Sequence, residues 1–404
     1  MKTAVSDLAI FGGEPAYDRP LHVGAPNIGD RHRLHELLDD ALDRRWLTND
    51  GPYAQAFERR LAERLGVRHC VATCNATTGL MILAAAMGLR GEVIMPSFTF
   101  VATAHALTWQ GITPVFCDVD PDTWTLDPRQ AADLISPRTT AILGVHLWGT
   151  PCDVAGLREV ASRHDLALAY DAAHAFGTSL AGRSVGSFGD AEVFSFHATK
   201  ICNTFEGGVV VTDDDDLAAR LALARNFGFI EVDRVVSLGI NAKMPEVNAA
   251  MGLVSLDSLD QFVEINRRNW ERYRVGLENV TGLTLYDPPV PERSSTYQYV
   301  VMEVHESAGL SRDELGQVLA AENIGSRRYF YPGCHRMEPY RTQCPDSGLR
   351  LPVTEAILER TLVLPTGTAT TAEALDRVCE ILSFAISRAS EVRVRLRSGS
   401  GRQV

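Results

Sequence analysis

Two ionisable residues stand where predicted strands end, and together they could carry out amine chemistry. Asp171 follows the apolar run 166–170, and Lys200 follows the run 191–196. A carboxylate at the end of an apolar strand is costly to bury unless it meets a cation. A lysine beside apolar residues has a lowered pKa, and its neutral amine is the nucleophile needed to form a Schiff base.

Asp171 and Lys200 lie 29 positions apart, at the ends of successive predicted strands. In this arrangement one of them could meet the ring nitrogen of a pyridoxal ring while the other reaches its aldehyde. The alternative is an ordinary salt bridge between Asp171 and Lys200 at neighbouring strand ends. Neither residue, taken alone, excludes this alternative.

A third candidate site follows the first predicted strand. Small and hydroxyl residues open an amphipathic helix in the segment 74–80 (CNATTGL). Backbone N–H groups at a helix N-terminus, reinforced by a threonine hydroxyl, form an anion site suited to a phosphate. Taken alone, the segment is equally typical of a plain Asn or Thr helix cap.

The elements that position these residues alternate between short apolar strands and amphipathic helices. The predicted strands cover residues 69–73, 92–95, 114–119, 140–145, 166–170, 191–196 and 208–212, and helices are predicted at 76–87, 101–110, 153–164 and 216–224. This alternation predicts a mainly parallel, seven-stranded sheet with helices on both faces. Ligands of such sheets bind beyond the carboxyl ends of the strands.

The second part of the chain predicts a smaller α+β domain. A charged helix or helix pair is predicted at 245–280, followed by a strand at 297–304 and helices at 311–322 and 371–388. We therefore expect a large α/β domain over 20–258 and a small domain over 259–390. The basic tail 391–404 shows no apolar period, so we expect it to be disordered.

Composition excludes several classes of protein. The chain has 404 residues and a net charge of −12, which argues against a sequence-independent nucleic-acid binder. The chain lacks a signal-like apolar segment and a run long enough to span a membrane. Eight scattered cysteines suit reduced thiols, so we expect a cytoplasmic protein without a metal site.

Several segments, in order, resemble the sugar aminotransferases of the DegT/DnrJ/EryC1/StrS family. The resemblance runs from about residue 20 to residue 382. It rests on 47–52 (LTNDGP), 96–100 (PSFTF), 145–149 (VHLWG), 171–174 (DAAH), 195–200 (SFHATK), 206–208 (EGG) and a late Leu364-Pro365. Any one of these motifs is weak evidence, but their order and spacing make chance very improbable.

The resemblance implies the type I fold of pyridoxal-phosphate enzymes, as in aspartate aminotransferase. It implies that Lys200 holds pyridoxal 5′-phosphate and moves a proton, and that Asp171 partners the pyridine nitrogen. It matches Thr77, Thr78 and Ser195 to the phosphate cup and Phe100 to the aromatic that stacks on the ring. His174 matches a family position near the phenolic oxygen of the cofactor ring. The alternative role for His174 is that of a hydrogen-bonded core histidine.

The segment 239–243 (GINAK) resembles one that reaches the partner subunit's active site, which implies a homodimer. Asn241 matches a cross-subunit phosphate contact. Lys243, a candidate substrate contact, replaces the usual arginine, and therefore keeps a point charge but loses bidentate geometry.

For the substrate, the segments 46–49, 226–229 and 331–335 look most like enzymes of actinomycete antibiotic pathways. These enzymes convert dTDP-4-keto-6-deoxyglucose to its 4-amino sugar with glutamate as the donor. Tyr331 and His335 are the candidate nucleotide-sugar contacts, with loop packing as the alternative. Amination at the 3-position of a dTDP-linked sugar is a second possibility.

Members and relatives of this family include two further functional classes. Dehydratases carry histidine at the position of Lys200, so the lysine argues against that chemistry. Relatives described as regulators would bind pyridoxal phosphate or sugar without catalysis, but this chain carries no helix-turn-helix pattern or basic patch.

Overall fold

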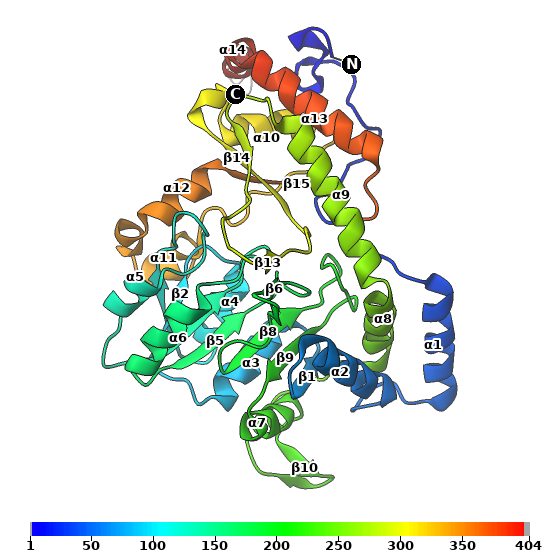
Figure 1. Cartoon of the computed structure of the whole chain (residues 1–404), viewed down its shortest axis with the longest axis vertical. Coiled ribbons are helices and arrows are strands. Elements are labelled where there is room, and N and C mark those ends of the chain that lie inside the picture. Colours follow the sequence, from blue (N-terminus) through cyan, green and yellow to red (C-terminus); the bar gives the residue numbers. More distant parts are fainter. Residues whose placement is uncertain (1, 400–404) are drawn as a thin grey trace.

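A seven-stranded sheet forms the centre of the computed structural model, which describes residues 2–399 (Figure 1). Its strands are β1 (His69–Thr73), β2 (Glu92–Pro96), β3 (Thr113–Cys117), β4 (Thr139–Val145), β5 (Ala167–Asp171), β8 (Ala191–Ser195) and β9 (Gly208–Thr212). All seven predicted strands are confirmed, with ends that shift by at most two residues. Most of their residues are buried, as expected for strands covered on both faces.

The strands follow the order β1-β9-β8-β5-β4-β2-β3, and only β9 runs antiparallel to its neighbours. The carboxyl ends of the other six strands therefore meet at one edge of the sheet. This edge gathers the residues that follow β1, β5 and β8, which are the three places where the sequence predicts chemistry.

Helices cover both faces of the sheet (Figure 1). They are α1 (Arg31–Arg44), α2 (Pro52–Leu65), α3 (Ala76–Ala86), α4 (Val101–Thr108), α5 (Pro128–Asp133), α6 (Val154–Arg163), α7 (Asp215–Arg225) and α8 (Glu246–Asp257). One apolar cluster packs α3, α4 and α7 against the sheet, and a second packs α2, α5, α6 and α8 against the other face. Several of these helices begin where an Asp or Asn side chain accepts hydrogen bonds from the first turn.

The helix α9 (Leu259–Leu277) leads into the small domain, so the predicted charged segment is a helix pair, α8 and α9. An antiparallel sheet joins β12 (Leu283–Leu285), β14 (Val300–Val304) and β15 (Thr361–Leu364). It packs with α10 (Arg312–Ala321) and α13 (Ala372–Ser387), while α12 (Pro352–Arg360) faces the large domain. The short elements are α11 (Tyr340–Gln343), β6 (Ser179–Leu180), β7 (Arg183–Ser184), β13 (Arg293–Ser294) and the hairpin of β10 (Phe229–Glu231) and β11 (Arg234–Val235).

The two ends of the chain depart from the sequence-based expectation. Val5 and Leu8 are buried in the core of the small domain, although the sequence assigned the first residues to no domain. Residues 391–399 were expected to be disordered, but they belong to helix α14 (Ala389–Gly399). Val392 is fully buried and shares a helical face with Ala389, so a short apolar stripe holds α14 against the small domain. Residues 400–404 of the expected tail lie outside the described residues.

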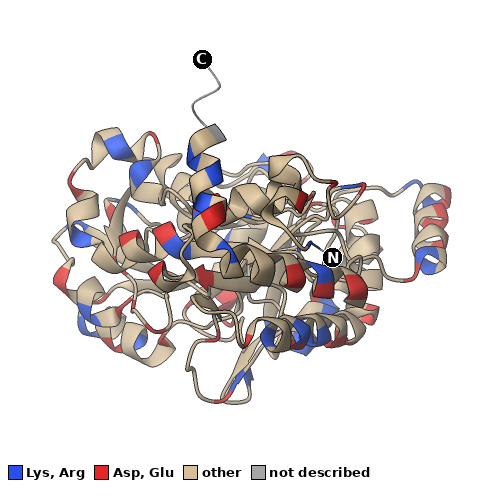
Figure 2. Cartoon of the chain, turned by 90° about the horizontal axis from the view of Figure 1, so that it is seen from above, with Lys and Arg blue, Asp and Glu red and all other residues tan. Residues whose placement is uncertain are grey.

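Acidic and basic residues are interspersed along the helices and loops rather than gathered in separate parts of the fold (Figure 2). None of the helices described between residues 2 and 399 is both long and apolar enough to cross a membrane.

The two domains meet in an aromatic cluster. Phe98, Trp124 and Trp148 of the large domain pack with Phe330 and Leu358 of the small domain. The Asp118 carboxylate, just beyond β3, accepts hydrogen bonds from the backbone N–H groups of residues 353 and 354, each at 2.8 Å, and so caps α12. These contacts fix the small domain above the carboxyl edge of the sheet.

Candidate functional site

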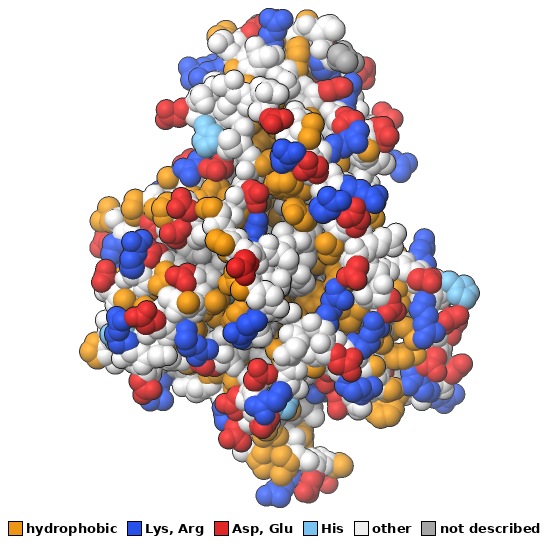
Figure 3. Space-filling view, viewed as in Figure 1, with side chains coloured by type: hydrophobic (Ala, Val, Ile, Leu, Met, Phe, Trp, Pro, Cys, Tyr) orange, Lys and Arg blue, Asp and Glu red, His pale blue; other side chains and the backbone are white. Residues whose placement is uncertain are grey.

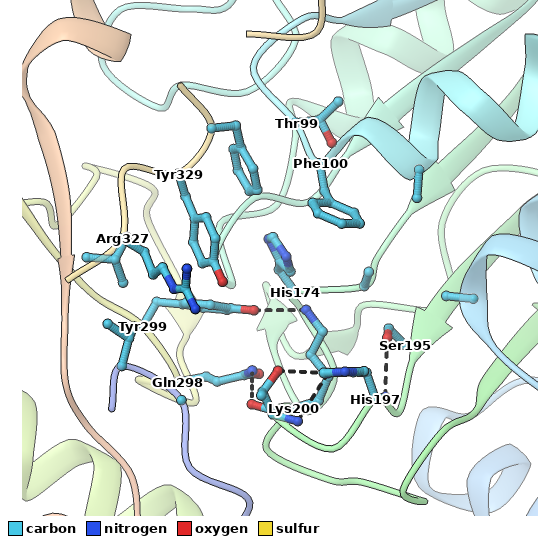
Figure 4. Close-up of a pocket in the computed structure, with 18 of the residues that line it drawn as sticks. Thr99, Phe100, His174, Ser195, His197, Lys200, Gln298, Tyr299, Arg327 and Tyr329 are labelled. Carbon is cyan, nitrogen blue, oxygen red and sulfur yellow. Dashed lines mark hydrogen bonds between the residues drawn. The ribbon is translucent and has the colours of Figure 1, made fainter. Parts of the chain in front are cut away.

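A cavity of about 450 Å³ lies between the two domains at the carboxyl edge of the sheet (Figure 4). Its lining combines residues of the large domain with residues of the small domain. They include Asn75, Thr77, Phe100, Asp171, His174, Ser195 and Lys200 from the former and Gln298, Tyr299, Arg327, Tyr329 and Phe330 from the latter.

Lys200 stands on the turn after β8 and extends its amine into the cavity. Its Nζ atom donates a hydrogen bond to the Tyr299 hydroxyl at 2.9 Å (Figure 4). Removal from water lowers the pKa of Lys200 to about 7, although the charge of Asp171 opposes this effect. A large fraction of the amine is therefore neutral near pH 7 and can act as a nucleophile.

Asp171 ends β5, in the strand next to β8, and is buried. One carboxylate oxygen accepts the Thr103 hydroxyl at 2.7 Å, and the other accepts the N–H of Ala173 at 3.0 Å. Burial raises the pKa of Asp171, while the two hydrogen bonds and the charge of Lys200 oppose the increase. The fold thus places a carboxylate with fixed orientation in the same cavity as Lys200.

His174 lies beyond β5 with its ring parallel to that of Phe330, at 5.7 Å between ring centres. Burial, followed by the charge of Lys200, lowers its pKa well below the usual range, so the ring is neutral. Within the described part of the chain, its buried Nδ1 atom has no hydrogen-bond partner. Because orphaned buried polar atoms are rare, this nitrogen is suited to a polar atom of a bound molecule.

The first turn of α3, where the sequence predicts an anion site, lies at the cavity. Ala76, Thr77 and Ser195 line the cavity. A Cβ atom added at Gly208 would lie 2.5 Å from the Ala76 nitrogen, so the glycine allows β9 to pass close to this helix terminus. Thr78 does not line the cavity, because its hydroxyl donates to the Asn75 carbonyl oxygen at 2.9 Å.

Phe100 precedes α4 and lines the cavity with 56% of its surface exposed. An exposed aromatic ring beside a buried carboxylate, an amine and a helix N-terminus suits a flat, phosphorylated aromatic molecule. His174, whose buried Nδ1 atom has no partner within residues 2–399, lines the same cavity. The residues present therefore fit pyridoxal 5′-phosphate.

Asn241 and Lys243 do not line the cavity of their own chain. Asn241 pairs with the backbone of Asn226, and the Lys243 amine donates to the Asn226 side chain at 2.7 Å. Both residues lie at the base of the projecting hairpin β10–β11. Their cross-subunit roles stay predictions.

The two expected substrate contacts of the small domain also lie outside the cavity lining. The guanidinium groups of Arg312 and Arg328 lie 5.0 Å and 4.7 Å from the ring centre of Tyr331. His335 is buried, with Nδ1 2.7 Å from the Ser97 hydroxyl and Nε2 2.7 Å from Glu355. These contacts favour the packing role that the sequence analysis left as the alternative for His335, and its contact to the nucleotide sugar stays a prediction.

Sequence analysis missed the small-domain wall of the cavity. Tyr299 fell within a predicted strand, while Arg327 and Phe330 carried no recognisable motif. These residues reach the cavity only through the packing of the two domains, which leaves no local pattern in the sequence.

Comparisons with known proteins agree with this site. The chain is 40% identical over 316 residues to the dTDP-4-amino-4,6-dideoxy-D-glucose transaminase of Shigella dysenteriae, covering 78% of this chain and 86% of that relative. It is 37% identical over 368 residues to the GDP-perosamine synthase of Caulobacter vibrioides, covering 90% and 97%.

A solved structure of DesI, determined in the presence of its TDP-sugar product, superimposes with a TM-score of 0.93. It shares 53% sequence identity and covers 98% of this chain and all of its own. The sequence profile of the DegT/DnrJ/EryC1/StrS aminotransferase family matches residues 29–383, and the chain belongs to this family.

Proposed function

We propose that this aminotransferase converts dTDP-4-keto-6-deoxy-D-glucose to dTDP-4-amino-4,6-dideoxy-D-glucose, with L-glutamate as the amino donor. The observation that carries the proposal is the amine of Lys200, with its pKa near 7, in one cavity with the buried Asp171. The name of the Shigella relative and the sugar product of DesI support the choice of substrate.

Each cavity residue has a place in holding pyridoxal 5′-phosphate. Thr77, Ser195 and the N-terminus of α3 would hold the phosphate, and Phe100 would cover one face of the ring. Asp171 would hold the ring nitrogen, and Nδ1 of His174 would meet a polar ring substituent. When bound, this cofactor supplies an aldehyde and a ring that accepts electrons from the reacting carbon.

Lys200 has two tasks in this reaction. Its neutral amine takes a proton from the carbon that carries the nitrogen, and the resulting ammonium returns a proton in the following step. The hydroxyl of Tyr299 orients the amine through their 2.9 Å hydrogen bond. The aromatic wall of Tyr329 and Phe330 narrows the access of water to these groups.

The functional unit is a homodimer in this proposal. Large hydrophobic side chains are exposed on the segment that projects beyond α7 (Figures 1 and 3). Within this projecting segment, which we define as residues 226–241, Val232 is 89% exposed and Leu238 is 92% exposed. Exposed apolar patches of this kind are typical of subunit interfaces. Association through this segment would carry Asn241 toward a second chain.

We also propose a cytoplasmic location and a place in the deoxysugar biosynthesis of an antibiotic pathway. The location is supported by eight cysteines that are all free, six of them buried. The pathway is supported by the resemblance of the segments 226–229 and 331–335 to enzymes of that kind.

The reaction is best tested in reverse, because the amino sugar then identifies the position of the nitrogen. Purified holoenzyme is incubated with dTDP-4-amino-4,6-dideoxyglucose and 2-oxoglutarate, and the keto sugar is identified by nuclear magnetic resonance. We expect glutamate and the 4-keto sugar in equal amounts, and no turnover by Lys200→Ala. Preferential turnover of a dTDP-3-amino sugar or of GDP-perosamine would contradict the proposed substrate.

A further inference from the structure

One cation of the small domain lines the cavity without an ionic partner. The charged residues of the lining, apart from histidines, are Asp171, Lys200, Glu206 and Arg327. Asp171 is held by Thr103 and Ala173, and Lys200 by Tyr299. Within residues 2–399 the guanidinium of Arg327 makes no ion pair, hydrogen bond or ring contact.

The backbone of Arg327 is fixed by the small-domain sheet. Its N–H donates to the carbonyl oxygen of Val363 at 3.0 Å, and the N–H of Val363 donates back at 2.8 Å. Val363 belongs to β15 and is fully buried. Figure 4 shows the Arg327 side chain directed toward the hydroxyl ends of Tyr299 and Tyr329. The guanidinium is therefore presented to the cavity from a backbone position that is hydrogen-bonded to β15.

The neighbouring arginine has a different environment. Arg328 lies 3.1 Å from the Asp313 carboxylate, and its guanidinium is 4.7 Å from the ring centre of Tyr331. Arg328 does not line the cavity. Successive residues of an extended segment point to opposite sides, which explains why only Arg327 faces the cavity.

A guanidinium without a protein partner suits a carboxylate, which it binds through two parallel hydrogen bonds. The α-carboxylate of an amino acid is attached to the carbon that carries its reacting nitrogen, so it must lie beside Lys200. In a 4-keto sugar nucleotide, the sugar ring separates the reacting carbon from the diphosphate on carbon 1. A cation in the wall of the same cavity is therefore better matched to the amino acid than to the diphosphate.

We propose that Arg327 holds a carboxylate of the amino donor and thereby lets one cavity accept both a dicarboxylic amino acid and a nucleotide sugar. This inference rests on the proposed function, because it assumes that the two substrates react in turn at Lys200. It adds a residue from the small domain that selects the donor.

The test compares two half-reactions that start from the same holoenzyme. Mixing the holoenzyme with L-glutamate, or with dTDP-4-amino-4,6-dideoxyglucose, consumes the visible absorbance of the covalently bound cofactor, and stopped-flow spectroscopy gives the rate at each concentration. Arg327→Gln removes the charge, Arg327→Lys keeps it without the bidentate geometry, and Arg328→Gln is the matched control.

We expect Arg327→Gln to raise the half-saturating glutamate concentration by about 10- to 100-fold, the usual effect of losing a charged hydrogen bond. Arg327→Lys should give a smaller increase, and the reaction with the amino sugar should stay within about twofold of wild type. Arg328→Gln should leave both reactions unchanged. L-Glutamine in place of glutamate then identifies which carboxylate Arg327 binds, because glutamine keeps the α-carboxylate but has an amide in place of the side-chain carboxylate. An effect of Arg327→Gln that persists with glutamine assigns the contact to the α-carboxylate, and an effect that disappears assigns it to the side-chain carboxylate.

A readout without turnover is the binding of glutarate to the holoenzyme, followed by calorimetry. We expect Arg327→Gln to weaken glutarate binding by a similar factor. An effect confined to the amino sugar would assign Arg327 to the diphosphate and overturn the proposal, as would equal effects on both substrates or none on either. If wild-type holoenzyme accepts glutamate but not the amino sugar, the proposed sugar is wrong while the role of Arg327 is still measured.

Discussion

Replacement of Asp171 by Asn removes a buried negative charge and leaves the shape of the side chain unchanged. The Thr103 hydroxyl lies within 3.0 Å of the Phe100 carbonyl oxygen as well as 2.7 Å from Asp171. It can therefore donate to the carbonyl and accept the new amide N–H. The second carboxylate oxygen, which accepts from Ala173, can become the amide oxygen. We expect the free energy of unfolding to fall by only about 1 kcal/mol.

The effect on catalysis should be much larger. Two unit charges 4 Å apart interact by about 4 kcal/mol at an effective dielectric constant of 20, so a carboxylate can hold a proton on the ring nitrogen strongly. An amide retains a dipole but no charge. A preorganised group aimed at developing charge is typically worth about 3–4 kcal/mol, which corresponds to a fall in kcat/KM of about 200- to 1000-fold.

The assay measures kcat/KM for transamination together with the thermal unfolding of each protein. Thr103→Val is a useful control, because it keeps the charge of Asp171 and removes one hydrogen bond that opposes the rise in its pKa. We expect this variant to lose about tenfold in kcat/KM, corresponding to about one hydrogen bond. Wild-type turnover by Asp171→Asn would refute the electrostatic role. A large loss of thermal stability in the same variant would show that Asp171 is mainly structural.

Four other predictions use different readouts. Because burial lowers the pKa of Lys200 to about 7, acetylation of this residue in cofactor-free protein should rise with pH and level off about one unit above that value, as mass spectrometry of the chain's three lysines can show. Tyr299→Phe should lower kcat by about three- to tenfold with unchanged KM values, because it removes only the hydrogen bond to Lys200. His335→Ala should lower the free energy of unfolding by about 2–4 kcal/mol in urea without raising the KM for the nucleotide sugar, since it leaves a cavity and removes the side-chain hydrogen bonds to Ser97 and Glu355. Co-expressed Lys200→Ala and Asn241→Ala chains should regain about a quarter of wild-type activity per site if the dimer shares its sites, whereas a simple sum of residual activities would place Asn241 within its own subunit.

The large domain was predictable because its signals are local. Each strand is a short apolar run, and the carboxyl ends of parallel strands must meet at one edge. The sequence alone is therefore enough to place Asp171 and Lys200 together. The strands β5 and β8 that carry them are direct neighbours in the sheet.

Two expected site residues do not line the cavity of this chain, for different reasons. Thr78 looks like Thr77 in sequence, but its hydroxyl donates to the nearby backbone carbonyl oxygen of Asn75. His335 stands in a motif that suggests a ligand contact, yet Ser97 and Glu355 occupy both of its nitrogens. Neither partner is close enough in sequence to reveal the contact.

Burial lowers the pKa of Lys200 and raises the pKa of Asp171, so it shifts the pKa values of the two central residues of the site in opposite directions. It favours the neutral form of Lys200, which the reaction needs, and it also favours the neutral form of Asp171, which the reaction does not need. The hydrogen bonds around the two groups differ accordingly. Asp171 receives two donors that stabilise its charge, from Thr103 and Ala173, whereas Lys200 has one neutral acceptor, Tyr299. One cavity can therefore hold an uncharged amine and a charged carboxylate, because the local donors, rather than the burial, distinguish the two groups.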